Sequence, residues 1–247
     1  MFRGRDPLFD NWTSGDASVV IDRARRSRTQ YTIVSPLLSL VPRGEADAFA
    51  GNEQAATVVT ETEGLLQWVV VNPLQPDTFD QADHMLGLAK CVGIKWHPEE
   101  HRYPITEHGR ILFEHAAKHC ALVLTHSGEA YSKPEDFIPF ANDFPDVKLI
   151  LAHIGCTDDE YPAHQVRGIQ MSKHDNVYAD TSSARSMISG IIEYAVKEVG
   201  PERILFGTDT PLYHAPCQRA RIDEAEISDE AKRLILRANA AALLGLE

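Results

Sequence analysis

Seven short apolar runs recur along the chain, and a longer amphipathic stretch follows each of them. The runs are rich in β-branched residues and predict strands at residues 31–35, 66–71, 91–96, 121–126, 147–153, 176–180 and 203–208. Strands that alternate with helices in this way form a parallel sheet covered by helices. Because 247 residues is the usual size of one (β/α)8 barrel, we predict an α/β fold of the TIM-barrel type and a single domain over residues 1–247.

The first strand of such a barrel is missing from this pattern. Residues 17–29 predict a first helix, but residues 1–16 contain no apolar run that could form a strand before it. We therefore predict a barrel that lacks its first strand. Either the domain is incomplete at its N-terminus because Met1 is not the natural start, or the barrel itself is incomplete. An open barrel exposes strand edges, so we expect pairing or homo-oligomerisation to cover them.

Three later helices can be placed from capping and stop signals. One is predicted at residues 106–119 and another at 186–199, which Gly200 and Pro201 would end. The last is predicted at residues 228–244, with Ser228 as its N-cap.

The charge balance and the hydropathy exclude several classes of partner. Acidic residues outnumber basic ones by 36 to 24, and the formal net charge of -12 would repel a nucleic acid. The apolar stretches are too short to cross a bilayer, and the first residues contain no apolar signal-peptide core. We expect a cytoplasmic protein that binds a small molecule rather than nucleic acid or membrane.

Three predicted strands end in residues suited to binding a metal and moving protons, namely His126, His153 and Asp209. The alternate positions before them are mostly apolar or small, as at Leu149 and Leu151 before His153, so we expect the three polar side chains to point into the barrel mouth. A single histidine at the end of a strand is more often a core residue whose ring nitrogens are hydrogen-bonded within the protein. Two imidazoles and a carboxylate together are costly to bury unless they bind a cation or transfer protons.

Several segments of the chain resemble the amidohydrolase-2 branch of the amidohydrolase superfamily, which includes metal-dependent hydrolases and some decarboxylases. The segments are GIKWHP, THSG, FPDVKLILAHIG, VYADTSS, RILFGTDTP and the ending NAAALLGL. Each motif is weak alone, but their order and spacing are fairly specific, and the similarity extends from about residue 17 onward.

The resemblance implies roles for the three strand-end residues. His126 would be a metal ligand, and Asp209 would lie near the metal as a ligand and accept a proton from the attacking water. His153 would be either a second ligand or an acid/base and orienting group. The implied cofactor is one divalent ion, zinc or alternatively manganese. The chain departs from the family in lacking the two first-strand histidines, separated by one residue, that both bind the metal.

Four further residues are candidates for substrate binding: Lys95, His97, Arg185 and His214. Arg185 would suit a carboxylate, so the substrate could be anionic. Binuclear members of the superfamily carry a carboxylated lysine that bridges two metals at the end of the fourth strand, so the resemblance implies this role as an alternative for Lys95. Lys95 could otherwise stay cationic and attract an anionic substrate, or pack its stem along Trp96 with its charge in solvent.

The remaining histidines have competing interpretations. His97 and His101 share one loop and could contact substrate, replace a missing ligand, or be solvated. His115 and His119 lie four residues apart on one predicted helix, a spacing that can hold zinc. Because no glutamate signature accompanies them, we interpret this pair as a solvated outer face.

The resemblance favours an enzyme that hydrolyses an amide, ester or lactone carbonyl. A metal-dependent decarboxylase or hydratase on the same barrel is the nearest alternative, since one scaffold supports several reactions. A degenerate barrel that only binds a small molecule is another alternative, because the first-strand ligands are missing.

Overall fold

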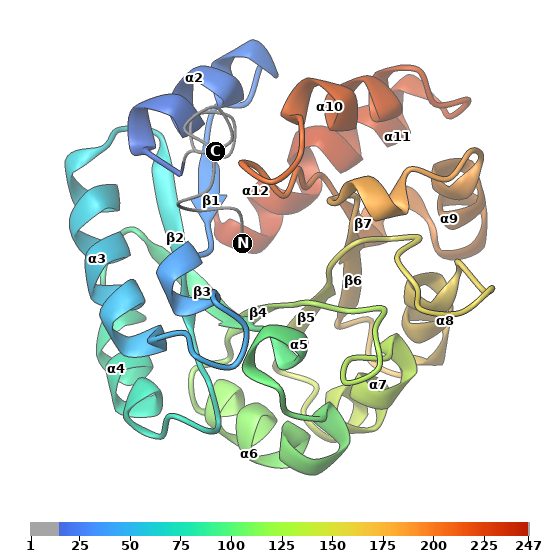
Figure 1. Cartoon of the computed structure of the whole chain (residues 1–247). Coiled ribbons are helices and arrows are strands. Elements are labelled where there is room, and N and C mark those ends of the chain that lie inside the picture. Colours follow the sequence, from blue (N-terminus) through green and yellow to red (C-terminus); the bar gives the residue numbers. More distant parts are fainter. Residues whose placement is uncertain (1–14, 247) are drawn as a thin grey trace.

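The computed structural model describes residues 15–246, and it contains one sheet of seven parallel strands in the order β1 to β7 (Figure 1). The strands are β1 (Thr32–Val34), β2 (Leu65–Val70), β3 (Cys91–Trp96), β4 (Leu122–Thr125), β5 (Lys148–Leu151), β6 (Val177–Asp180) and β7 (Ile204–Leu205). Each predicted strand is confirmed. The sheet curls as in a TIM barrel without one strand, which confirms the predicted fold class. Residues 1–14, which belong to the segment predicted to contain no strand, lie outside the described residues.

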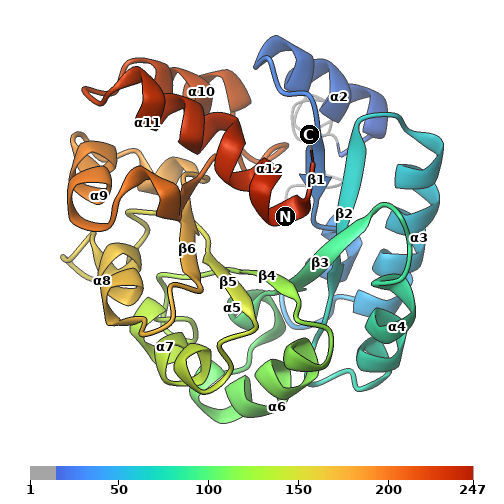
Figure 2. The same cartoon turned by 180° about the vertical axis from the view of Figure 1, so that it is seen from behind.

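Helices surround the outer face of the curled sheet (Figures 1 and 2). In chain order, the helices of the described residues are α2 (Ala17–Arg26), α3 (Ala48–Glu61), α4 (Asp77–Met85), α5 (Pro98–His101), α6 (Ile105–Lys118), α7 (Pro134–Asp143), α8 (His164–Met171), α9 (Ile191–Val199), α10 (Ala215–Asp223), α11 (Asp229–Arg233) and α12 (Asn239–Leu244). The short α5 lies inside the ring of helices in Figure 1, and α12 packs at the barrel opening rather than on the outer face. A π-helical turn, Leu234–Ala238, connects α11 to α12. Within residues 15–246, none of the helices is both long and apolar enough to span a bilayer.

The capping signals locate the last helix correctly but misplace the start of an earlier one. Ser228 Oγ accepts a hydrogen bond from the Ala231 N–H at 3.2 Å, as expected of an N-cap. The helix predicted from residue 186 begins instead at Ile191, because Gly190 before it has a left-handed backbone with φ 76°.

Two apolar layers hold the barrel together. The larger lies between the sheet and the surrounding helices and includes Val69, Ile94 and Leu149. The smaller fills the barrel interior and centres on Trp68, Ile150 and Leu205. Burial of these layers supplies the main driving force for folding.

The C-terminal helix packs at the opening of the barrel. Within the described residues, β1 and β7 are the outer strands of the sheet, and no pairing joins them. In Figure 1, α12 lies between these two strands. Its Ala240 and Leu243 pack against the interior cluster, so the protein's own helix covers part of the opening. Homo-oligomerisation stays a prediction.

Asn52, a buried residue of α3, makes hydrogen bonds to the end of β2 of the kind that a neighbouring strand would make. Pairing between β1 and β2 ends at Val34 and Gln67, whereas β2 continues to Val70. The Val70 N–H donates to Asn52 Oδ1 at 2.9 Å, and Asn52 Nδ2 donates to the Val70 carbonyl at 2.8 Å. Because Val70 pairs with Lys95 on β3, this amide also supports a strand that leads to the barrel mouth.

Replacing this amide tests its structural role. We expect Asn52→Ala to lower the free energy of unfolding by about 2 to 4 kcal/mol, because two buried backbone groups lose their partners. Exposed Thr57→Ala, on the same helix, should change it by less than about 0.5 kcal/mol. Chemical denaturation measures both values, and equal stability of the two variants would contradict this role.

Candidate functional site

The three strand-end residues line one cavity of about 1110 Å³ that extends from the barrel mouth into its interior. His126 directly follows β4, and His153 lies two residues beyond β5. Asp209 follows β7 by four residues and lies within the TDTP turn. Because all the strands are parallel, their carboxyl ends meet at one face of the barrel. The structure therefore brings these residues to a common cavity.

The side chain of His153 enters the cavity for a reason that strand alternation does not provide. Leu149 and Leu151 pack in the outer layer against the helices, while Ile150 faces the interior. Continued alternation would direct His153 outward, so that part of the sequence argument is wrong. A left-handed backbone at His153, with φ 72°, redirects its side chain. Asp209 also has a left-handed backbone, with φ 55°, and such strain is concentrated at functional sites.

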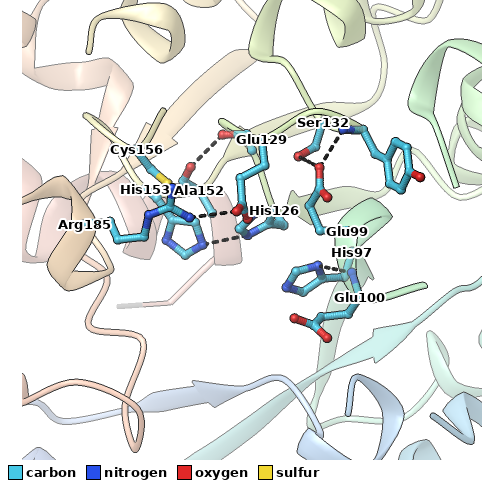
Figure 3. Close-up of polar contacts among 12 residues, drawn as sticks. His97, Glu99, Glu100, His126, Glu129, Ser132, Ala152, His153, Cys156 and Arg185 are labelled. Carbon is cyan, nitrogen blue, oxygen red and sulfur yellow. Dashed lines mark hydrogen bonds and ion pairs between the residues drawn. The ribbon is translucent and has the colours of Figure 1, made fainter. Parts of the chain in front are cut away.

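A continuous chain of hydrogen bonds links the two histidines to two carboxylates. Ser182 Oγ donates to Asp180 Oδ1, and His153 Nδ1 lies 2.7 Å from Ser182 Oγ. His153 Nε2 then lies 3.2 Å from His126 Nδ1, and His126 Nε2 lies 2.7 Å from Glu129 Oε2. Figure 3 shows His126 between His153 and Glu129.

This chain is one proton short when its carboxylates are ionised and its imidazoles are neutral. Four contacts join its five groups, and each contact needs one proton. The Ser182 hydroxyl and the two neutral imidazoles supply one each, which gives three. If Ser182 donates to Asp180 and His126 donates to Glu129, the unprotonated nitrogens of His153 and His126 face each other. A cation bound by the two nitrogens would remove the repulsion between their lone pairs.

Electrostatics maintain the proton shortage at neutral pH. Burial lowers the pKa of His126, and burial together with the neighbouring His126 lowers the pKa of His153 to about 4. The hydrogen bond from His126, assisted by one from Arg185, lowers the pKa of Glu129 to about 2. The imidazoles are therefore neutral and Glu129 is ionised, the forms in which these groups bind metals.

Lys95 supplies a buried cation to the same cavity. Its side chain comes from β3 and is 5% exposed. Among the described residues, its ammonium has no hydrogen-bond or ion-pair partner. Burial lowers the pKa of Lys95 to about 8, although the charges of Asp180 and Asp209 oppose this shift. A desolvated ammonium without a partner favours an anionic ligand.

His97 lies beside His126 in the cavity, with the two rings stacked at a centroid distance of 4.3 Å. Its Nδ1 accepts a hydrogen bond from the Glu100 N–H at 3.3 Å, which leaves the ring proton on Nε2. Burial lowers the pKa of His97 well below its usual value. This neutral ring can donate one hydrogen bond to a ligand.

The other predicted contacts have different surroundings. Arg185 lines the cavity, but its guanidinium already contacts Glu129 Oε1 at 2.7 Å and the Thr157 carbonyl at 3.2 Å. His214 is exposed and is not among the cavity-lining residues. His101 is buried and its Nε2 contacts the Ser39 carbonyl at 2.8 Å, which gives it a structural partner.

Sequence reasoning did not identify Glu129, Asp180 or Ser182 as parts of the site. Glu129 follows His126 by three residues. This spacing is a usable signal, because a side chain in the short loop after a strand can reach back to the residue that ends the strand. Asp180 and Ser182 lie in the YADTSS segment, but only the fold brings that segment against His153.

The donors at the barrel mouth suit a divalent ion, but they do not form a closed cluster. His126, His153 and Asp209 offer nitrogen and oxygen ligands of the kind that zinc and manganese bind. Within residues 15–246, the one group of three such residues whose ligand atoms lie within 4.8 Å of one another is elsewhere, at Asp83, His115 and His119. Metal binding at the mouth therefore requires side-chain adjustment.

Comparisons with solved structures place the fold among known barrel enzymes. Over 92% of this chain and 87% of the other, a 2,6-dihydroxybenzoate decarboxylase in complex with 2,6-dihydroxybenzoate is 15% identical, with a TM-score of 0.71. The 5-carboxyvanillate decarboxylase of Sphingomonas paucimobilis is 12% identical, covering 98% and 86%, with a TM-score of 0.73. A dihydroxybenzoic acid decarboxylase of Polaromonas, with bound manganese and 2-nitroresorcinol, is 16% identical, covering 94% and 86%, with a TM-score of 0.70.

At these identities the solved structures establish similarity of fold. No curated protein matches the sequence significantly. The family described as amidohydrolase matches residues 38–246, which confirms the resemblance seen in the strand-end motifs. Because that match spans most of the sequence, this chain belongs to the amidohydrolase family of enzymes.

Proposed function

We propose that this protein is a metal-dependent enzyme that decarboxylates a small anionic substrate at the barrel mouth. The observation that carries the proposal is the buried ammonium of Lys95, which has no partner among residues 15–246 and lies in the cavity that His126, His153 and Asp209 also line. A carboxylate or phenolate would provide the missing partner of Lys95. The decarboxylases of similar fold, one of them complexed with 2,6-dihydroxybenzoate, make an aromatic carboxylate the first substrate to test.

In this proposal each residue has a separate task. Lys95 binds the anionic substrate, and the Nε2–H of His97 donates a hydrogen bond to it. Asp209 would relay a proton from water to the substrate carbon, which keeps the electron pair of the broken C–C bond as carbon dioxide leaves. His126, His153 and Asp209 would hold a divalent ion, which would polarise a substrate oxygen. Glu129 and Asp180 keep the two imidazoles oriented through the hydrogen-bond chain.

Hydrolysis is the second candidate, favoured by the family assignment and by a carboxylate at the position of Asp209. In that reaction Asp209 would take a proton from water, which then attacks an amide, ester or lactone carbonyl. Incubation with 2,6-dihydroxybenzoate and with small lactones distinguishes the reactions. Release of carbon dioxide from 2,6-dihydroxybenzoate supports decarboxylation. Ring opening of a lactone without release of carbon dioxide would instead support hydrolysis and contradict the proposed decarboxylation.

Removing the proton-transfer group should abolish turnover. We expect Asp209→Asn to lower kcat at least about 100-fold, because an amide cannot exchange the proton. The melting temperature should stay close to that of the wild type. His214→Ala, an exposed substitution outside the cavity, should retain activity. Wild-type turnover by the Asp209 variant would refute this role.

Removing the metal should stop the reaction. Treatment with a chelator is expected to inactivate the enzyme, and added Zn²⁺ or Mn²⁺ should restore it. His126→Ala should stay inactive after the same additions because a ligand is missing, whereas exposed His174→Ala should recover fully. Steady-state assays measure all three proteins, and full activity in the chelated wild type would contradict a metal-dependent mechanism.

Substrate binding should weaken as the pH rises through about 8, the pKa to which burial lowers Lys95. Below that pH the ammonium is charged and binds the anion, and above it the charge is lost, so KM rises. Lys95→Gln should raise KM about tenfold or more and remove this pH dependence. A KM profile of the variant that parallels the wild type would exclude Lys95 as the anion-binding group.

A further inference from the structure

Asp83, His115 and His119 form a cluster on the outside of the barrel, away from the cavity that the strand-end residues line. Asp83 lies on α4. His115 lies in the last turn of α6, the neighbouring helix in the outer ring, and His119 is the C-cap residue of that helix (Figures 1 and 2). His115 Nε2 and His119 Nε2 each lie 2.7 Å from Asp83 Oδ1. The predicted solvated face is wrong for His115, which is buried because Asp83 supplies its polar partner.

The cluster has the donor set and the spacing of a transition-metal site. Its three ligand atoms lie within 4.8 Å of one another. In a tetrahedral zinc site with bonds of 2.0–2.1 Å, ligand atoms lie about 3.3 Å apart. Each nitrogen now lies 2.7 Å from the carboxylate oxygen, so moving it about 0.6 Å further away would make room for the ion. Histidines four residues apart on one helix present their rings on the same face.

The surroundings restrain the ligands while keeping the site accessible. The rings of His115 and Phe79 pack in a T-shaped arrangement at a centroid distance of 4.9 Å, and this contact restricts rotation of the imidazole. The side chain of Asp83 is 46% exposed and that of His119 is 27% exposed. Solvent can thus reach the cluster, and water can occupy the fourth position of a tetrahedral ion.

We propose that Asp83, His115 and His119 form a second metal site, which binds zinc and joins α4 to α6 on the outer face of the barrel. The three protein ligands and one water complete the coordination, and the ion replaces the hydrogen bonds that both imidazoles now make to Asp83 Oδ1. The site is separate from the proposed centre at the mouth, because none of its residues lines that cavity.

One feature of the cluster limits its affinity. His115 Nδ1 is buried and has no hydrogen-bond partner among the described residues. Metal-binding histidines usually donate from their second nitrogen, and loss of such a partner lowers affinity about 10- to 100-fold. We therefore expect reversible zinc binding that depends on the free zinc concentration.

The experiment uses a parent protein in which the barrel mouth is disabled. His126→Ala and Asp209→Asn are combined in the full chain, so that zinc at the mouth does not obscure the outer site. Competition with a chromogenic chelator measures zinc affinity, and thermal unfolding with and without zinc measures stabilisation. The parent is expected to bind one zinc ion and to melt at a higher temperature when zinc is present.

Two variants remove ligands, and one serves as a matched control. In the parent background, His119→Ala and Asp83→Asn should each weaken zinc binding at least about tenfold and remove most of the zinc-dependent rise in melting temperature. His84→Ala removes an exposed histidine next to Asp83 on the same helix and should leave both measurements unchanged.

The outcomes separate this proposal from the function at the mouth. Failure of the parent to bind zinc, or equal zinc affinity in the parent and both ligand variants, would overturn the outer site. Neither result bears on turnover, which is measured with an intact mouth. Conversely, the wild type could lack activity while the mouth-disabled parent binds zinc and loses that binding in the His119→Ala variant. That result would contradict the proposed function and would support the outer site.

Discussion

The contact between His126 Nδ1 and His153 Nε2, at 3.2 Å, is the interaction on which the barrel mouth depends. It joins the ends of two adjacent strands, and the hydrogen-bond chain through it is one proton short at neutral pH. Burial disfavours protonation of either ring. The structure thus concentrates lone pairs where water is scarce, an arrangement that a divalent ion can stabilise.

The mouth also combines opposite charges that serve different purposes. The mouth contains three carboxylates suited to holding a metal, its ligands or a proton, namely Asp209, Asp180 and Glu129. Lys95 is a buried cation that has no direct partner in the described part of the chain. An ion and an anionic substrate would complement these two sets of groups. In the proposed function, the buried ammonium of Lys95 would allow a chain with a strongly negative net charge to bind a small anion.

The sequence predicted the strands well because each is a short β-branched run, and it identified polar residues at the strand ends that the structure brings to one cavity. It could not predict how His153 enters the cavity. The inward and outward alternation of side chains along β5, in which Leu149 faces outward, is interrupted by the left-handed backbone of His153. The partnership of His115 with Asp83 was also missed, since it joins two helices. Glu129 was overlooked because loop carboxylates are common and only contact with His126 distinguishes this one.

The central claim is that the neutral imidazoles of the mouth hold a metal ion together with Asp209. Anomalous X-ray diffraction from crystals grown with Mn²⁺ tests it most directly, because the signal identifies the ion and its position. We expect a peak within coordination distance of His126 and Asp209, next to His153. Clear density for these side chains without a peak between them, while manganese occupies other positions, would contradict the account.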